Sequence, residues 1–382
     1  MKKHTSKIAI AQLILCGMLF ASITQAAPIE TLPGIQWEEK FGDNNYSYQK
    51  DITAAHPRHA SIIIAGSYQT IPALKSEAPK TEGLWIWEIN AKGEKIADIK
   101  LKNSEGKIYY KIRSLAVATD DSMLLVSESG NGSSELVKIK PNGDVLFSNK
   151  MSSRKYVSKI LYAGNGKFAL FGTEKKNVLL MMVDDNGAVL WEKVINRGTD
   201  AAFLDGVLSD DGGFVLLENT VKDSLPEIWL VKYDSTGVKY SEKSFSGKNG
   251  SIARGKDNSY AVVYDSGTSS EQDIWMRSFD KSLSEKWNLN IAFAKFGLER
   301  FKIAGLSNGD YIIAGTVMLE PWISYVSSTG LKIWDFHNKA MNTAAVIDLV
   351  IKDDNCYFIS FAFTVTAEKQ VVDKIRVLNF QP

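Results

Sequence analysis

The fold is decided by residues 211–240, which read DGGFVLLENTVKDSLPEIWLVKYDSTGVKY. Two short apolar runs lie in this stretch, Phe214 to Glu218 and Ile228 to Tyr233, and turn residues precede or follow them. Short runs rich in Val, Ile and aromatic residues, bounded by Asp, Ser and Gly, are typical of β-strands. The turn residues favour the positive-φ conformations that join two antiparallel strands. The stretch therefore predicts an antiparallel sheet.

The first of these runs recurs along the chain. Its seven copies end at Gly66, Ser127, Gly172, Glu218, Tyr264, Gly315 and Phe361, so that successive copies are separated by 61, 45, 46, 46, 51 and 46 residues. A second pair of strands follows each copy, and a four-stranded repeat of this size matches the blade of a β-propeller. We expect an all-β fold, a seven-bladed β-propeller with four antiparallel strands in each blade.

The two ends of the chain predict how the ring closes. The seventh repeat stops after its third strand, at residues 374–378, and lacks a fourth. Near the N-terminus, residues 34–40 (GIQWEEK) resemble the fourth strand of the third repeat, residues 187–193 (GAVLWEK). We expect residues 34–40 to pair with residues 374–379 and complete the last blade, which leaves no blade with a missing edge strand. Residues 27–382 then form a single domain.

An aromatic residue follows a turn glycine by four positions in three repeats, at Phe147, Trp191 and Trp334. This pattern is similar to the tryptophan-docking pattern of quinoprotein repeats, and the chain resembles the bacterial secreted β-propellers of the quinoprotein-like and WD40-like superfamily. The resemblance implies a fold and no activity, because the vicinal cysteine pair of quinoprotein dehydrogenases and the Gly-His signature of WD40 repeats are missing. We expect no cofactor, and structural roles for Trp191 and Trp334.

The N-terminus has the pattern of a secretory signal peptide. Three lysines within the first seven residues precede an apolar run at residues 8–23, and small residues lead up to Ala27. We expect residues 1–26 to be a signal peptide cleaved near Ala26, and the protein to be periplasmic or secreted. A lipoprotein site at Cys16 is the alternative, although the bulky Leu15 precedes it. A membrane anchor is disfavoured because the apolar run is shorter than a span of about 20 residues.

The charge balance excludes a basic nucleic-acid-binding surface. The chain has 45 basic and 44 acidic residues, and loss of residues 1–26 would remove three lysines, giving 42 − 44 = −2. Such a nearly neutral chain lacks the positive field that nucleic acids require. Cys356 would then be the remaining cysteine, and its apolar surroundings predict a buried, unreactive thiol. We expect a monomer without a membrane span.

No recognisable catalytic or metal-binding motif is present. His56 and His59 lie in a turn-like segment without a third ligand nearby, so we predict no metal site. Acidic turns such as residues 184–187 could suggest calcium, but turns this short use Asp and Asn to bond their own backbone. The sequence favours a non-enzyme. A propeller enzyme, whether a lyase, a glycosidase or a quinoprotein-like protein, stays a further alternative.

A column of polar residues is the first candidate site. Counting thirteen residues back from the end of each apolar run gives Thr53, Ser114, Lys159, Asp205, Ser251, Lys302 and Asp348. This column belongs to the innermost strands, which surround the central channel. It is either a solvated lining that keeps the blades in register, or a site for a small polar ligand or glycan at the channel mouth. Such a site would use Lys159, Asp205, Lys302 and Asp348, with Arg113 and Arg300 nearby.

The loops on one face are the second candidate site. Residues 67–84 form the longest connection between second and third strands and carry Ile71 and Leu74. Residues 102–110 form a connection on the same face and end at Tyr109 and Tyr110, which could also begin the next strand. Binding residues gather on loops held by a rigid scaffold, and apolar or aromatic side chains there favour protein contacts. Our first hypothesis is a non-catalytic scaffold or inhibitor that binds another protein through this face.

Overall fold

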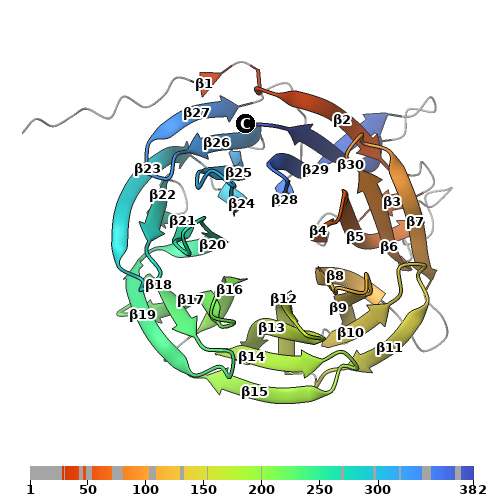
Figure 1. The fold of residues 1–382 in the computed structure, drawn as a ribbon. Helices are drawn as coiled ribbons and strands as arrows, with labels where there is room; N and C mark the ends of the chain where they lie inside the picture. The colour runs from red at the N-terminus through yellow and green to blue at the C-terminus, as the bar shows by residue number, and fades with distance from the viewer. Residues whose placement is uncertain are drawn as a thin grey trace, which may run out of the picture.

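The structure, a computed structural model, describes residues 28–29, 31–42, 46–48, 54–70, 81–102, 109–129, 133–152, 154–198, 200–267, 271–295, 298–317, 320–337, 346–365 and 371–382. Within these residues, seven antiparallel sheets follow one another around a ring (Figure 1). One strand of each blade lies nearest the ring axis, and the strand at the outer end of its sheet lies on the rim (Figure 1). The predicted seven-bladed β-propeller is therefore confirmed.

The blades are numbered in chain order. Blade 1 contains β3 (Tyr46–Tyr48), β4 (Ala54–Arg58), β5 (Ser61–Thr70), β6 (Thr81–Asn90) and β7 (Lys95–Lys102); blade 2 contains β8 (Tyr109–Val117), β9 (Met123–Ser129), β10 (Ser134–Ile139) and β11 (Val145–Lys150); blade 3 contains β12 (Lys155–Gly164), β13 (Lys167–Glu174), β14 (Asn177–Asp184) and β15 (Val189–Ile195). Blade 4 contains β16 (Ala202–Leu208), β17 (Phe214–Lys222), β18 (Leu225–Tyr233) and β19 (Lys239–Ser246); blade 5 contains β20 (Lys248–Arg254), β21 (Tyr260–Gly267), β22 (Glu271–Phe279) and β23 (Glu285–Lys295). Blade 6 contains β24 (Leu298–Gly305), β25 (Tyr311–Val317), β26 (Glu320–Val326) and β27 (Lys332–His337), with β1 (Pro28–Ile29) added; blade 7 contains β28 (Val346–Lys352), β29 (Asn355–Val365), β30 (Val371–Phe380) and β2 (Ile35–Phe41).

The hydrophobic core lies between neighbouring blades. Middle strands such as β14 are buried on both faces, which explains why they read as continuous apolar runs rather than as alternating ones. Between blades 3 and 4, Phe171 stacks on Phe203 at 5.7 Å and meets Phe214 edge-on at 5.3 Å, measured between ring centroids. Each blade face is thus covered by the next blade, and the ring must close for the last face to be buried.

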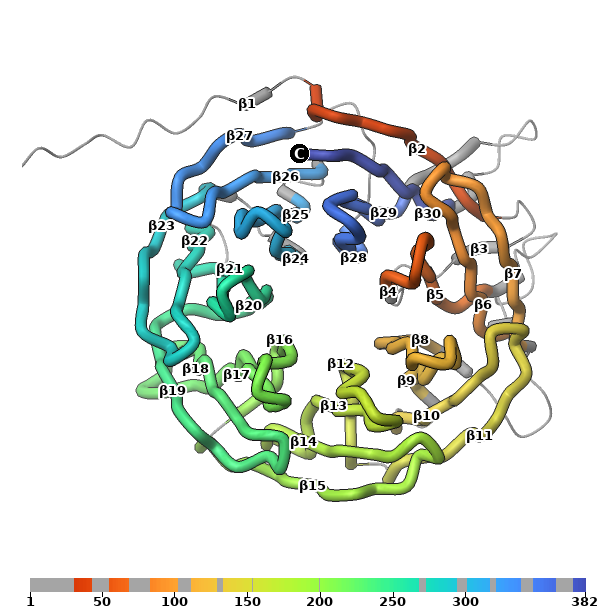
Figure 2. The backbone as a smooth tube through the Cα atoms, in the orientation of Figure 1, coloured from red at the N-terminus to blue at the C-terminus, as the bar shows by residue number. Residues whose placement is uncertain are grey.

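The two ends of the chain close the ring, as the sequence predicts. Strand β2 pairs antiparallel with β30, and its register sets Trp37 opposite Asn379 and Phe41 opposite Ile375. Figure 2 shows the N-terminal β2 running along the C-terminal β30 on the rim. The segment before β2 adds a contact that the sequence did not predict. There, β1 lies parallel to β27, with Pro28 opposite Asp335, and so extends the outer edge of blade 6.

Aromatic residues of the outer strands dock onto turn glycines of the next blade. A Cβ atom on Gly237 would lie 3.0 Å from the Trp191 ring, and Gly237 has a φ of +73°, so contact and backbone both require glycine. The same contact is made by the pairs Trp37–Gly93, Phe147–Gly187 and Trp287–Gly330. Trp334 is 9% exposed and packs in the core that blade 6 shares with blade 7. The predicted structural packing of Trp191 and Trp334 against neighbouring blades is confirmed.

Blade 5 departs from this pattern in a complementary way. Its outer turn has Leu283 at a φ of +66°, where the other turns have glycine, and the facing strand of blade 4 has Ser241 in place of an aromatic residue. Leu283 is completely buried in the cluster between blades 4 and 5. Its side chain therefore supplies the packing that an aromatic residue supplies elsewhere, and this offsets the left-handed backbone, which costs a non-glycine residue about 1 kcal/mol.

We expect Trp191→Ala to lower the free energy of unfolding by about 3 kcal/mol, because it removes a large ring packed between two blades. Urea denaturation followed by circular dichroism measures the change. Leu190→Ala is the matched control, since Leu190 precedes Trp191 and is 48% exposed; we expect it to change stability by less than about 0.5 kcal/mol. A Trp191→Ala protein as stable as this control would contradict the docking role.

The structure differs from the sequence predictions for two loops. Strand β5 extends to Thr70 and β6 begins at Thr81, because β3 pairs with the end of β5 and prolongs this hairpin. The connection is therefore shorter than the predicted residues 67–84, and Ile71 and Leu74 lie outside the described residues. Tyr109 and Tyr110 begin β8 rather than ending a loop, and their side chains are not described. None of the described residues forms a helix long and apolar enough to span a membrane.

Candidate functional site

The polar column lies on the innermost strands, directly after irregularities in their pairing. A register shift precedes Ser114, Lys159, Asp205 and Asp348, and such bulges redirect the side chain that follows them. Blade 1 differs from the prediction. By register, Ala54 pairs with Ala65 and so takes the place that the spacing assigned to Thr53, because this blade is one residue shorter there. Thr53 itself lies outside the described residues.

Members of this column fasten neighbouring blades together. The hydroxyl of Ser114 accepts the backbone N–H of Ile160 in blade 3 at 3.1 Å. The carboxylate of Asp205 accepts the N–H of Ile252 in blade 5 at 3.1 Å, and that of Asp348 accepts the N–H of Ala55 in blade 1 at 3.3 Å. Each donor directly follows the column position of the next blade. A side chain thus bridges the inner strands, where no backbone ladder joins one blade to the next.

Asp205 is the most heavily bonded member of the column. Its buried carboxylate also accepts bonds from the hydroxyl of Ser251 at 2.8 Å and from the N–H of Gly206 at 2.9 Å, and it forms an ion pair with Lys159. Burial alone would raise the pKa of Asp205. The ammonium groups of Lys159 and Lys302, together with the hydrogen bonds, outweigh burial and lower this pKa to about 2. The carboxylate therefore stays charged at every physiological pH.

The other residues predicted for the channel site are Arg113, Lys302 and Arg300. Arg113 forms an ion pair with Glu128 and stacks on the ring of Tyr156, with 3.9 Å between the guanidinium carbon and the ring centroid. Burial lowers the pKa of Arg113, although Glu128 opposes this. Lys302 acts on Asp205 across two blades and is half-buried. Arg300 lies in β24, but its side chain is not described.

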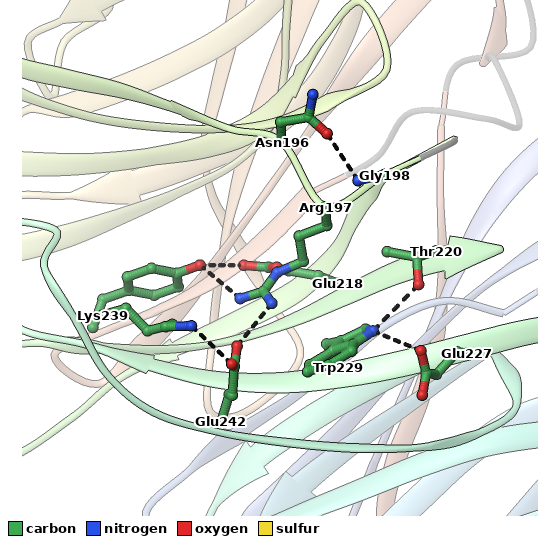
Figure 3. Close-up of polar contacts among 10 residues, drawn as sticks. Asn196, Arg197, Gly198, Glu218, Thr220, Glu227, Trp229, Lys239 and Glu242 are labelled. Atoms are coloured by element: carbon green, nitrogen blue, oxygen red, sulfur yellow. Dashed lines mark hydrogen bonds and ion pairs between the residues drawn. The ribbon is translucent and has the colours of Figure 1, made fainter. Parts of the chain in front are cut away.

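A second cluster of charged residues joins blades 3 and 4 near the rim, and the sequence analysis did not identify it. Arg197 follows the end of β15 and reaches over blade 4, where it forms ion pairs with Glu218 and Glu242 (Figure 3). Its guanidinium carbon lies 5.0 Å from the ring centroid of Trp229, a cation–π contact. Lys239 donates to Glu242 at 2.7 Å. The cluster is a network of ion pairs and hydrogen bonds around one arginine.

Glu218 is the unusual member of this cluster because it is completely buried. The hydroxyl of Tyr233 donates to it at 2.7 Å, and burial raises the pKa of Glu218 even though Arg197 opposes the shift. A signal for this residue was present in the sequence. Among the ends of the seven apolar runs it is the one acid, whereas the others are Gly66, Ser127, Gly172, Tyr264, Gly315 and Phe361. An acid in a column of small and aromatic residues marks this blade as different.

Exposed apolar side chains lie along the rim of every blade, and those of the other four blades are Ile35, Ile96, Phe293, Leu331 and Ile333. Seven more belong to blades 2 to 4. They lie on or next to the outer strands β11, β15 and β19, and we call them the rim surface: Val145, Leu146, Val189, Leu190, Val194, Val238 and Tyr240. Their exposed fractions run from 42% at Val145 to 77% at Tyr240. Scattered exposed apolar residues need no explanation, whereas neighbouring exposed apolar residues that form a continuous patch are typical of interaction surfaces.

His56, His59 and Cys356 have separate surroundings in the structure. His59 lies in an exposed turn and its ring faces Asp121 at 3.1 Å, whereas His56 lies in the half-buried strand β4 and not in the predicted surface turn. Burial lowers the pKa of His56. Cys356 is buried as predicted, and burial raises the pKa of its thiol. In the described ranges, no three His, Cys, Asp or Glu side chains are grouped so as to hold a metal ion.

Comparison with known proteins supports the fold and leaves the activity open. No family model and no curated protein matches the chain. Among solved structures, virginiamycin B lyase from Staphylococcus aureus with quinupristin aligns with a TM-score of 0.59 at 12% identity, over 90% of this chain and 98% of that one. The polysaccharide lyase Uly1 aligns with a TM-score of 0.59 at 6% identity, over 91% and 99%.

A third neighbour differs at the point where the ring closes. The propeller domain of the trilobed protease from Pyrococcus furiosus aligns with a TM-score of 0.53 at 9% identity, over 89% of this chain and 96% of that one, and is described as having an open velcro topology. In the present chain β2 closes blade 7. At these identities the likeness shows the propeller fold alone, and no match supports the quinoprotein-like assignment specifically.

Proposed function

We propose that this propeller binds another protein, and that its partner is an extended segment lying along the rim surface. The proposal rests on the exposed apolar side chains of the rim surface. Strands β11, β15 and β19 each end their sheets, so backbone groups and exposed apolar side chains lie side by side there. Such edges are where proteins add a strand from a partner, with main-chain bonds for affinity and side-chain contacts for specificity.

The chain itself contains an example of such an addition. Strand β1 lies parallel along the outer edge of blade 6, and Pro28 and Ile29 are in register with Asp335 and Phe336. An outer edge of this propeller therefore accommodates a further extended segment. The bonding of the polar column supports the same proposal, because Asp205 and Asp348 use their carboxylates to fasten blades and offer little to a ligand.

The proposal is tested by placing the photo-crosslinking residue p-benzoylphenylalanine at Leu146 or Leu190, with Lys286 on β23 as the matched control outside the rim surface. We expect both rim positions to yield one discrete product with a protein from the native extract, and position 286 to yield none. An excess of the parent protein without the cross-linking residue should compete for the partner and suppress this product. The same excess of the Val189→Lys/Leu190→Lys variant should not suppress it. The cross-linking residue is also placed at Ile71 and at Leu74 of the predicted loop face. A product that arises only from these two positions would contradict the rim surface and favour the loop face.

A site for a small polar ligand at the channel mouth is the second candidate. The side chain of Lys159 is 27% exposed whereas that of its partner Asp205 is 7% exposed, so the ammonium group can face a ligand while the acid holds it in place. Binding of an anionic ligand or glycan should then be lost in a Lys159→Ala/Lys302→Ala variant. Enzyme activity stays the further alternative, because two of the neighbours with this fold are named as lyases.

A further inference from the structure

A cleft of about 450 Å³ lies beside the Arg197 cluster, where β15 of blade 3 meets blade 4. Its lining residues are Lys193, Val194, Ile195, Asn196, Arg197, Tyr233, Gly237 and Lys239. Three of these are cations, and none is an acid. Sites for small molecules commonly have volumes of about 300–1,000 Å³. The cleft therefore has the size of a small-molecule site, and its polar groups are mainly hydrogen-bond donors.

The guanidinium of Arg197 is held rigidly at this cleft. Its Nε–H donates to Glu218, one terminal nitrogen donates to Glu242 at 2.8 Å, and the other lies 3.4 Å from the hydroxyl oxygen of Tyr233. Trp229 covers one face of the group. A guanidinium has five N–H bonds, so two remain for a ligand after these three contacts. Arginine fixed in this way binds planar or tetrahedral oxyanions at little further cost in side-chain entropy.

The remaining donors come from both sides of the cleft. Lys193 forms no ion pair within the described chain. It acts electrostatically on Asp234, whose Oδ1 already accepts bonds from the backbone N–H groups of Thr236 and Val238 in its own turn. The side-chain oxygen of Asn196 accepts the N–H of Gly198 at 2.8 Å, which leaves its amide N–H groups as donors. Lys239 keeps half of its side chain exposed while it pairs with Glu242.

We propose that this cleft binds a small oxyanion, a carboxylate or a phosphate group, between Lys193, Arg197 and Lys239. Glu218 and Glu242 stand behind the lining and neutralise Arg197 and Lys239, so Lys193 supplies the uncompensated charge. The completely buried Glu218 has the role of a positioning residue, since it orients the guanidinium without lining the cleft. This site shares Val194 with the rim surface, but its three cations lie outside that set of residues. It assigns a use to the acid that distinguishes blade 4 from the other blades.

Isothermal titration of the full chain with sodium succinate and, separately, with inorganic phosphate tests this proposal. Sodium chloride of equal ionic strength is the reference titration. We expect saturable binding of at least one probe, and the probe that binds identifies the oxyanion as carboxylate or phosphate. In the Lys193→Ala/Lys239→Ala variant the affinity should fall at least tenfold. The control variant Lys222→Ala/Lys243→Ala removes two exposed lysines of blade 4 that do not line the cleft, and it should bind as the parent does.

Arg197→Lys adds a test of geometry, because it keeps the charge and removes the forked donors. Its affinity should also fall, with a circular dichroism melting curve confirming that the protein is folded. Should Arg197→Lys unfold the protein, the lysine pair alone tests the proposal, since Lys239 is exposed and Lys193 is only half-buried. The proposal is overturned if neither probe binds above the chloride reference, or if the control variant weakens binding as much as Lys193→Ala/Lys239→Ala does.

Discussion

Removal of residues 27–41 is expected to lower the free energy of unfolding by at least 3–5 kcal/mol, roughly the cost of losing one large buried side chain. The deletion removes β2, exposes the edge of β30, and takes Trp37 away from Gly93 and Tyr357. The indole of Trp37 also donates to the carbonyl of Ala91 at 2.7 Å, which ties blade 7 to blade 1. Because the ring must close to bury its last face, the loss should exceed that of an ordinary edge strand.

Chemical denaturation of the truncated and full chains measures this difference. Trp37→Ala separates the docking contact from the strand pairing and should reproduce part of the loss, whereas Gln36→Ala changes an exposed neighbour and should have little effect. An unchanged melting temperature in the truncated protein would contradict the claim that the two ends of the chain close the ring.

Asp205→Ala is expected to destabilise the protein by about 3–5 kcal/mol, the usual result of breaking a buried ion pair from one side. The substitution leaves Lys159 without its counter-ion, and it removes the acceptor for Ser251 and Ile252 in blade 5. Ser251→Ala is the matched control, since it removes one hydrogen bond of the same network and should cost about 1 kcal/mol. Equal stabilities for the two variants would argue against Asp205 as a fastening between blades.

The same carboxylate predicts an acid-labile component of stability. The pKa of Asp205 is lowered to about 2 in the folded chain, below an unfolded value of about 3.9. A lowered folded pKa contributes stability above the unfolded pKa, and this contribution is lost as the pH falls toward the folded pKa. The stability difference between the parent and Asp205→Asn should therefore shrink by about 2 kcal/mol from pH 5 to pH 2. A difference independent of pH would contradict the low pKa.

The fold could be predicted from the sequence because the repeat is visible in local patterns. Turn residues, apolar runs and the similarity of residues 34–40 to residues 187–193 define the blades and the closure. Spacing also located Lys159 and Asp205 correctly on the inner strands, but could not show that they form an ion pair with each other. The length of an inner strand is set by its pairing, and for this reason the spacing assigned Thr53 where the register has Ala54.

The Arg197 cluster could not be predicted because its members come from three strands and one connection. Glu218 and Glu242 are joined by Arg197, which follows the end of β15 and reaches over blade 4, and no local pattern encodes this contact. The docking role of Trp287 was also missed, since Leu283 stands where the other turns have glycine. The rim surface was missed for another reason. Its residues are of the types found in any strand, and their exposure depends on whether a further element covers the edge.

The most direct test of the central claim is the affinity of the cross-linked partner for three purified proteins, measured by surface plasmon resonance. These are the parent, Val189→Lys/Leu190→Lys on the rim surface, and Lys159→Ala/Lys302→Ala in the polar column. Protein binding along the rim predicts at least a tenfold weaker Kd for the rim variant and an unchanged Kd for the column variant. Loss of binding in a folded column variant, with the rim variant unaffected, would contradict the account.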